Sequence, residues 1–243
     1  MFRRTTRGFV IGGALSALAV GVSACSSSSI PKATEAPARA SAESADPDHD
    51  VWTGEDLSTL LLSVGDLPKG KGYKVQKGYP VNSGTHFGGP FSKPVKARCE
   101  WLMSTTWSEA SNVGPASYAG SYFANSAQDE YLEEIDSYRS ADAWTAMDRL
   151  KKYARGCSTF KDTDGSPITV TAATKPLPGP GDDSLEVDMT SDVNTVMGHT
   201  AVVSRIGHDI IFSSCTDARS QAIQTAQENA RKLATAVKAK TGN

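Results

Sequence analysis

The spacing of apolar residues changes several times along the chain, and each change predicts a different element of secondary structure. Residues 56–68 have leucines at helical spacing up to Pro68 and predict a helix. Residues 73–81 predict a strand, and residues 98–107, which alternate loosely between apolar and polar side chains, predict another. Residues 82–94, with their Gly-Gly-Pro run, predict the loop between these strands.

The middle of the chain has two alternating segments followed by a strongly periodic one. Residues 116–126 and 129–140 predict an antiparallel pair of strands. Ser140 is the expected N-cap of a helix that runs to Cys157, and Trp144 is expected in the core beside the apolar stripe of that helix. The stripe consists of Ala143, Met147, Leu150, Ala154 and Cys157.

The C-terminal third predicts further strands and a last helix. The strands are expected at residues 166–175, 184–191, 198–206 and 209–215. Gly207-His208 has the position of a two-residue hairpin turn, which would expose His208 at its tip. The last helix begins at about Ala218, with an apolar face of Ile223, Ala226, Ala230, Leu233 and Val237.

These elements predict an α+β fold in which an antiparallel β-sheet is flanked by helices. Helices and hairpin-linked strands occur in separate runs, which is typical of that class and not of a parallel α/β fold. Residues 51–243 have the length of one ordinary domain and contain no internal repeat, so we expect a single domain there.

Residues 1–24 have the three parts of a secretory signal peptide. Three arginines precede an apolar stretch from Phe9 to Val22, and the small residues Ser23 and Ala24 follow it. The stretch is shorter than the roughly 20 apolar residues that span a bilayer, although an uncleaved anchor is the alternative. Arg3-Arg4 leaves both the general secretory route and twin-arginine export open.

The end of this signal peptide, Val22-Ser23-Ala24-Cys25, resembles the bacterial lipobox. The resemblance implies that Cys25 receives a diacylglyceryl group and becomes the new N-terminus, and two or more acyl chains give stable anchoring. Residues 25–50 then comprise the lipidated cysteine and a disordered linker rich in Ser, Ala and Pro, with a span of about 25–30 Å. We expect an exported domain tethered to the outer face of the cytoplasmic membrane.

The charge of the mature chain excludes one class of partner. Cleavage before Cys25 leaves 22 Lys and Arg against 27 Asp and Glu, a net charge of −5. An acidic surface argues against nucleic acid and against broad electrostatic adhesion to anionic lipid. The expected partners are the membrane, through the lipid anchor, and an unknown small ligand or envelope protein, and no cofactor is expected.

Motifs of catalysis and metal binding are missing from the sequence. The chain lacks GxSxG, HExxH and a complete phosphate-binding loop of the pattern GxxxxGK[ST]. A metal site built from His199 with Asp188 or Asp192 lacks the usual ligand spacing, so none is expected. Asp182-Asp183 supplies too few oxygens for calcium.

Acidic residues of the segment 129–140 are the remaining candidates for acid–base chemistry. They are Glu133, Glu134 and Asp136. Because neighbouring residues of a strand point to opposite faces, we expect them not to form a pair. Cys215 would need a nearby base to act as a nucleophile, and the sequence does not locate one. We therefore expect no catalytic residue and no enzyme.

Three cysteines follow Cys25, namely Cys99, Cys157 and Cys215. An exported protein can hold disulfides, and three thiols allow one bridge and leave one odd sulfur. The chain has no CxxC spacing, so neither a zinc knuckle nor a thioredoxin-type redox pair is expected.

These cysteines lie in segments that occur in a recognisable order. A segment Arg98-Cys99-Glu100 comes first, then ADAWTAMDRLKKYARGC (141–157), then VVSRIGHDIIFSSC (202–215). In this order and spacing, roughly residues 55–240 resemble the extracellular sensor-domain family of actinobacteria. That family includes the outer domain of a mycobacterial serine/threonine kinase and many lipoproteins. The resemblance implies an antiparallel sheet flanked by helices, with a central cleft proposed for ligand binding.

The family pattern also implies two disulfides. One maps onto Cys99 and Cys157. The other lies in the terminal hairpin, where only Cys215 matches, since the partner position falls near Gly198. Cys215 is then either a buried free thiol or the partner of Cys157, and we favour the Cys99–Cys157 bridge.

The hypothesis that follows is a lipid-anchored extracytoplasmic binding or sensor module without catalytic activity, whose ligand is unknown. One alternative is a cell-envelope hydrolase or transferase with a site assembled from distant residues. Another is a scaffold that contacts envelope proteins. A deep apolar pocket would favour the binding module, a cleft with a perturbed His or carboxylate pair the enzyme, and a flat apolar patch the scaffold.

Overall fold

The computed structural model describes residues 48–241, except residues 90, 92, 105–106, 163–167 and 195–196. The predicted signal peptide, Cys25 and most of the predicted linker lie outside the described residues. Within the described part of the chain, no helix combines the length and the apolar character that crossing a bilayer requires.

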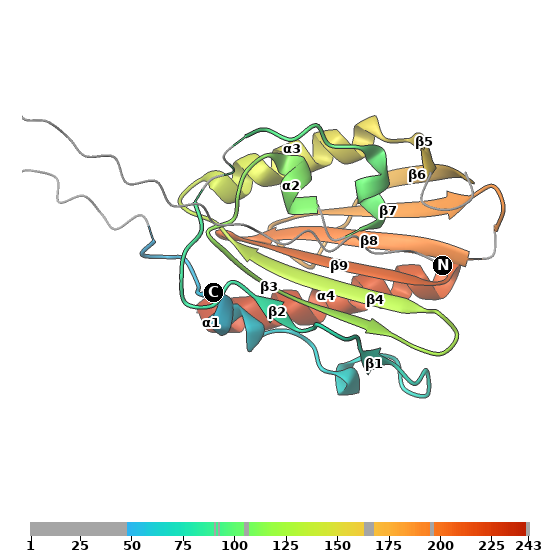
Figure 1. Ribbon diagram of the computed structural model, residues 1–243, viewed down its shortest axis with the longest axis horizontal. Coiled ribbons are helices and arrows are strands. Elements are labelled where there is room, and N and C mark those ends of the chain that lie inside the picture. Colours follow the sequence, from blue (N-terminus) through green and yellow to red (C-terminus); the bar gives the residue numbers. More distant parts are fainter. Residues whose placement is uncertain are drawn as a thin grey trace, which may run out of the picture. The chain divides into compact units, whose positions relative to one another are not determined.

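An antiparallel sheet of nine strands runs through the described part of the chain (Figure 1). Its order is β1-β3-β4-β9-β8-β7-β6-β5, and β2 pairs with β3 beside β1. The strands are β1 (Lys74–Val75), β2 (Val81–Asn82), β3 (Ser117–Ala124), β4 (Glu130–Ser137), β5 (Thr159–Asp162), β6 (Ile168–Pro176), β7 (Asp183–Ser191), β8 (Met197–Ile206) and β9 (Asp209–Ala218). The predicted α+β class is confirmed.

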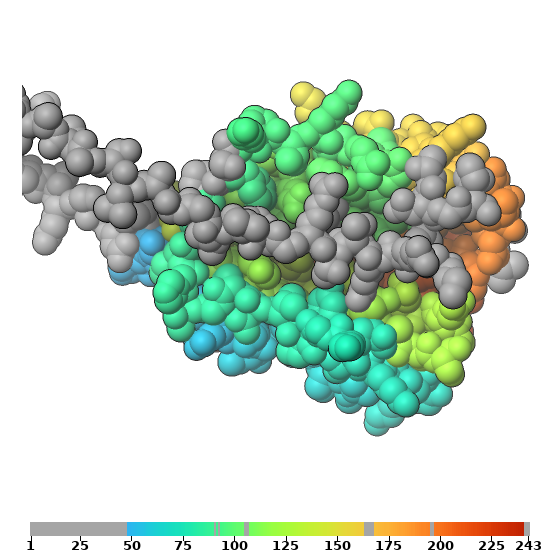
Figure 2. Space-filling model, in the orientation of Figure 1, coloured from blue at the N-terminus to red at the C-terminus, as the bar shows by residue number. Residues whose placement is uncertain are grey.

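Helices cover both faces of this sheet. α2 (Trp107–Ser111) and α3 (Asp142–Gly156) pack on one face, and α4 (Arg219–Thr241) packs on the other (Figure 1). The short helices are α1 (Gly54–Ser58) and the 3₁₀ helices η1 (Val64–Asp66) and η2 (Cys99–Met103). On the face shown in Figure 2, the segment with β1 and β2 (teal) lies along the lower edge, and the segment with α2 (green) lies above it.

The alternation of side chains along each strand decides which core a residue enters. On β8, Val203 packs with α3, whereas Val202 packs with α4. On β9, Phe212 faces α3 and Ile211 faces α4. The sheet therefore separates two cores of different composition.

The two long helices confirm their predicted apolar faces. In the α3 stripe Ala143, Met147, Leu150 and Ala154 are at most 1% exposed, and Cys157 is 4% exposed. In the α4 face Ala226, Ala230, Leu233 and Val237 are buried, while Ile223 is only half-buried. The predicted turn at Gly207 is also confirmed, because β8 and β9 flank it and its φ is 55°.

Three predictions for the chain before β3 are wrong. The helix expected over 56–68 ends at Ser58, and the Leu62 amide donates to the buried Glu133 carboxylate at 2.9 Å instead of continuing a helix. The strand expected over 73–81 is divided into β1 and β2 by a turn at Gly78, whose φ of 89° favours glycine. Residues 98–107, expected as a strand, form η2 and the start of α2 instead. This helical backbone buries the side chains of Leu102 and Trp107 against α3.

Predictions around the start of α3 are also corrected. Ala141 is the N-cap position, and Ser140 has a φ of 46° with its carbonyl oxygen 2.6 Å from the His208 ring. Trp144 is 43% exposed instead of entering the core, and its ring lies 4.4 Å from the Arg205 guanidinium. His208 is half-buried against Trp144 instead of exposed at the turn. The short strand β5 was not expected from the sequence.

Candidate functional site

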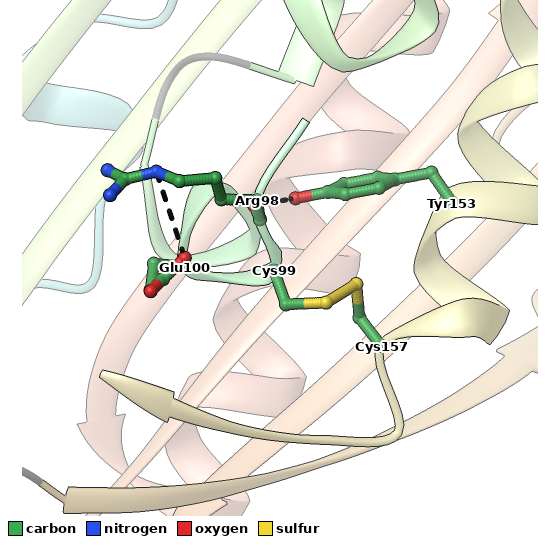
Figure 3. Close-up of a disulfide and its surroundings, with 5 residues drawn as sticks. All are labelled: Arg98, Cys99, Glu100, Tyr153 and Cys157. Atoms are coloured by element: carbon green, nitrogen blue, oxygen red, sulfur yellow. Dashed lines mark hydrogen bonds and ion pairs between the residues drawn. A yellow bond between two sulfur atoms is a disulfide. The ribbon is translucent and has the colours of Figure 1, made fainter. Parts of the chain in front are cut away.

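A disulfide joins Cys99, at the start of η2, to Cys157, directly after α3 (Figure 3). Its Cα atoms are 5.4 Å apart, and Cys215 is a buried free thiol. This pairing is the one that the family resemblance implies. Beside the bridge, the Tyr153 hydroxyl donates to the Arg98 carbonyl oxygen at 2.7 Å (Figure 3). The two contacts tie η2 to the end of α3.

An open pocket of about 630 Å³ lies beside this disulfide, between α2 and α3. It is lined by Pro94, Ala97, Ala110, Ser111, Asn112, Arg149, Lys152, Tyr153, Gly156 and Cys157. The Arg149 guanidinium is engaged with the carbonyl oxygens of Ser111 and Asn112, at 3.2 and 3.3 Å. The pocket therefore offers a mainly apolar surface with few convergent polar groups.

A second pocket, which we call the polar pocket, has a volume of about 470 Å³ and lies between α4 and residues 65–71. Its lining consists of Gly65, Asp66, Leu67, Pro68, Lys69, Lys71, Asp217, Gln221, Gln224, Thr225, Glu228, Asn229 and Lys232. The α4 residues recur every three or four positions, so one face of the helix forms a wall of the pocket. The volume lies in the range of about 300–1,000 Å³ typical of ligand sites.

Hydrogen bonds hold residues 65–71 in place as the opposite wall. The Asp66 carboxylate accepts from the amide and the hydroxyl of Ser63, at 2.8 and 2.7 Å. The Lys232 ammonium of α4 donates to the Asp66 carbonyl oxygen at 2.5 Å. Leu67 is 3% exposed and anchors the segment in the core on the α4 side.

Lys71 fastens the far end of the same wall. Its ammonium lies 2.9 Å from the Asp217 carboxylate, 2.9 Å from the Gln221 amide oxygen and 3.4 Å from the Asp129 carboxylate. The hydrogen bond with Asp217 raises the pKa of Lys71 above its ordinary value. Lys71 thus links the wall to β9 and to the first turn of α4.

Two donors of the polar pocket have no partner among the described residues. Asn229 is 1% exposed, and its side-chain Nδ2 donates to no acceptor there. Lys69 is exposed, and within the described part of the chain it makes neither a hydrogen bond nor an ion pair. A buried amide donor without an acceptor is unfavourable by roughly 1–3 kcal/mol, which makes Asn229 the feature of this pocket that needs an explanation.

Glu133 is buried on the α4 side of β4, and it positions the chain that leads into the polar pocket. Its carboxylate accepts from the Leu62 amide at 2.9 Å and from the Tyr131 hydroxyl at 3.0 Å. Burial raises the pKa of Glu133 to about 8. The carboxyl group thus carries its proton at neutral pH, and its contact with Leu62 lies just before the wall that begins at Gly65.

Glu134 and Asp136 form a carboxyl pair on the opposite face of β4. Glu133 and Glu134 point to opposite faces, as expected. Glu134 and Asp136 are two positions apart and share one face, so the expectation that none of these acids pair is wrong. Burial raises the pKa of both, and the Asp136 carboxylate raises that of Glu134 further. The Tyr138 hydroxyl donates to Asp136 at 3.4 Å.

The residues considered for a metal site do not come together. The register of β7 and β8 places His199 opposite Met189, so His199 and Asp188 lie on opposite faces. Asp188 pairs with Arg219 at 2.6 Å, and burial lowers the pKa of His199 to about 4. Asp192 accepts from the Thr169 amide at 3.0 Å. Among the described residues, no three His, Cys, Asp or Glu side chains form a metal-binding group.

The acidic pair Asp182-Asp183, considered for calcium, is likewise engaged. Asp182 lies 3.2 Å from the Arg205 guanidinium and accepts from the Gly207 amide at 2.9 Å. Asp183 pairs with Lys151. Each carboxylate therefore ties β7 to a neighbouring element, and neither is left for a calcium ion.

The polar pocket could not be predicted from the sequence, because its residues come from segments that are far apart in the chain. Its one local signal is Asn229, which interrupts the alanine-rich face of α4 between Ala226 and Ala230. A polar residue among buried alanines indicates either a packing partner or a ligand. The lysines of residues 65–71 carry no such signal in the sequence.

Comparisons with known proteins support the fold alone. No family model and no curated protein matches the chain. Among solved structures, it is similar to the crystal structure of the extracellular domain of PknH from Mycobacterium tuberculosis. The sequence identity is 14%, the TM-score is 0.53, and the match covers 77% of this chain and 99% of that chain. The chain thus shares the fold of an extracellular domain.

Proposed function

We propose that this protein is a lipid-anchored binding module of the sensor type, exposed on the outer face of the cytoplasmic membrane and without catalytic activity of its own. The observation that carries the proposal is the fold, which matches an extracellular domain over 99% of that domain. The lipobox at Cys25 supplies the tether, and the predicted linker holds the domain clear of the headgroups.

The polar pocket supports a binding role for the domain. It has the volume of a ligand site, two walls fixed by ion pairs and hydrogen bonds, and a buried donor that finds no partner in the described part of the chain. A wall that is already ordered binds a ligand with less loss of entropy. The module would then report occupancy through another protein.

The test uses the full chain expressed in an actinobacterial host, compared with its Cys25→Ser variant. The wild-type protein is expected in the membrane fraction, with a diacylglyceryl-modified N-terminal peptide in its mass spectrum, and the variant without that modification. Native mass spectrometry of the wild-type protein before and after denaturation then detects a bound molecule. A soluble wild-type chain with an unmodified Cys25 and no bound mass would overturn the proposal.

A second candidate function rests on the Glu134–Asp136 pair. Two carboxyl groups with raised pKa values are typical of acid–base sites, and this favours a cell-envelope hydrolase or transferase. Neither of the two pockets described above is lined by either residue. Glu134→Gln and Asp136→Asn should abolish any hydrolysis of envelope material by the purified protein if this candidate is right, and should leave a background rate unchanged if it is wrong.

A further inference from the structure

The charges that line the polar pocket identify the kind of molecule it can hold. Its lining carries three lysines and three carboxylates, so its formal charge is zero. The carboxylates are Asp66, Asp217 and Glu228, and the lysines are Lys69, Lys71 and Lys232. The formal charge therefore does not distinguish an anionic ligand from a cationic one. The difference lies in which charged groups already have a partner.

Each of these carboxylates already has a partner. Asp217 lies 2.9 Å from Lys71, and Glu228 lies 3.3 Å from Lys232. Asp66 accepts both the amide and the hydroxyl hydrogen of Ser63. A cationic ligand would have to compete with a lysine or with a capping interaction that holds the wall, so the pocket does not present a free acceptor of high charge.

The donors, in contrast, are not all engaged. Lys69 has no partner within the described residues, and Asn229 holds an unpaired Nδ2 under the pocket surface. Asn229 is one of the residues that line the pocket, and the terminal torsion of an asparagine side chain is soft, so the amide can reorient. An acceptor on a ligand would pair with this donor, which has no acceptor among the described residues. Binding would then be favourable because it removes the free-energy cost of burying an unpaired donor.

We infer that the polar pocket binds a small organic oxyanion, a carboxylate or a phosphate monoester, with Lys69 and Asn229 as its donors. This inference rests on the proposed function of the domain as a binding module. Pro68, an exposed residue of the lining, gives the carbon skeleton of such a ligand an apolar surface. Lys69 provides the charge complementarity, and Asn229 provides a directed hydrogen bond.

The experiment is isothermal titration calorimetry on the mature lipidated chain in mild detergent, with probes of different charge. Succinate tests the carboxylate, glycerol 3-phosphate the phosphate monoester, xylitol a neutral polyol and putrescine a cation. We expect saturable binding of succinate or of glycerol 3-phosphate, weaker at high ionic strength, and no binding of the other two. The anion that binds more tightly identifies which of the two groups the pocket takes.

Variants locate the binding in the polar pocket. Lys69→Gln should weaken the affinity for the anion about fivefold, as expected for a partly screened charge pair. Asn229→Asp, which replaces the amide by a carboxylate of the same shape, should weaken it at least about tenfold. Lys77→Gln is the matched control, because Lys77 is an exposed lysine outside the pocket lining, and it should leave the affinity unchanged.

Several outcomes would overturn the inference. Tighter binding of xylitol or putrescine than of either anion would show a different ligand class, while the proposed binding function would stand. An equal loss for Lys69→Gln and Lys77→Gln would show non-specific charge attraction. Absence of binding by all four probes would refute the oxyanion site, and the native mass spectrum of the untreated protein would then decide separately whether the domain binds a ligand at all.

Discussion

The two faces of the sheet differ in the side chains that cover them and in the bonds that fasten them. The face under α3 is filled by large apolar side chains such as Met147, Leu150 and Phe212, and the Cys99–Cys157 bridge fastens it. The face under α4 packs alanines of the helix against apolar strand residues such as Tyr131, Ile135 and Ile211, and it also buries polar strand residues. Among them, Ser213 donates to the Ala226 carbonyl oxygen at 3.1 Å.

The two sides also differ in how many of their buried polar groups could bind a ligand. Burying apolar area is worth about 25 cal/mol per Å², whereas a buried polar group contributes little unless it finds a partner. Several polar atoms on the α4 side have no partner among the described residues, including Asn229 Nδ2, Ser204 Oγ and Asp209 Oδ1. Apolar packing thus stabilises both sides, while the α3 side carries the disulfide and the α4 side carries the polar pocket.

The largest effect is expected from removing the disulfide of the α3 side. The paired change Cys99→Ser with Cys157→Ser opens a loop with a sequence separation of 58, which should lower the free energy of unfolding by about 4 kcal/mol. Denaturant titration measures the loss. Cys215→Ser is the control, because it changes a free thiol without breaking a bridge, and an equal loss in the control would remove the disulfide from this account.

The second-largest effect is expected from removing an apolar side chain from the core on the α3 side. Leu150→Ala removes a side chain that is 1% exposed and should lower the free energy of unfolding by about 3 kcal/mol, because it leaves a cavity between α3 and the sheet. Lys152→Ala changes an exposed position of the same helix and should be nearly neutral. Thermal or chemical unfolding of both variants checks the contrast, and a neutral Leu150→Ala would contradict it.

A pH-dependent effect is expected on the α4 side. The pKa of Glu133 is raised from 4.5 to about 8, so the folded state binds a proton that the unfolded state has lost. Its contribution to stability is complete below pH 4.5 and is lost as the pH rises through about 8. Glu133→Gln keeps an oxygen for the Leu62 amide and cannot ionise, so it should be more stable than the wild type above pH 8 by on the order of 2 kcal/mol.

The measurement for Glu133→Gln is the difference in unfolding free energy between variant and wild type as a function of pH. That difference isolates Glu133 from other groups of the protein. Burial of His199, whose pKa falls to about 4, acts in the opposite direction, since this stability is lost as the pH falls through that value. A difference that stays constant from pH 4.5 to 8 would show that Glu133 does not titrate in this range.

The smallest effect is expected at Trp144. A core tryptophan replaced by alanine costs about 3–5 kcal/mol, but Trp144 is 43% exposed, and its main contact is with the guanidinium of Arg205, which is 9% exposed. Trp144→Ala should therefore lower the free energy of unfolding by only about 1 kcal/mol or less. Unfolding by denaturant distinguishes the surface contact from the core position that the sequence predicts.

Local patterns could be predicted where the pattern and the tertiary environment agree. The α3 stripe from Ala143 to Ala154, the hairpin at Gly207 and the start of α4 follow from periodicity and turn chemistry alone. Residues 98–107 alternate loosely and so predict a strand. The same pattern also fits a helical segment, and the burial of Leu102 and Trp107 against α3 selects that helical form. Short elements depend most on such packing.

The candidate site was less predictable, for a geometric reason. The Glu134–Asp136 pair follows from the period of a strand, because residues two positions apart share one face of the sheet. The polar pocket was out of reach, because Lys69, Asp217 and Asn229 come from three separate segments. Only the folded chain brings their side chains together.

The sequence by itself determined the α+β class, the antiparallel strands β3, β4 and β6 to β9, and the buried faces of the two long helices, because each depends on periodicity within one segment. Tertiary structure alone decided that Trp144 lies at the surface, that Leu62 leaves the helical path to reach Glu133, and that α4 and residues 65–71 enclose a pocket. Those outcomes depend on contacts between distant segments, whose free energy exceeds the small preferences that a local pattern records.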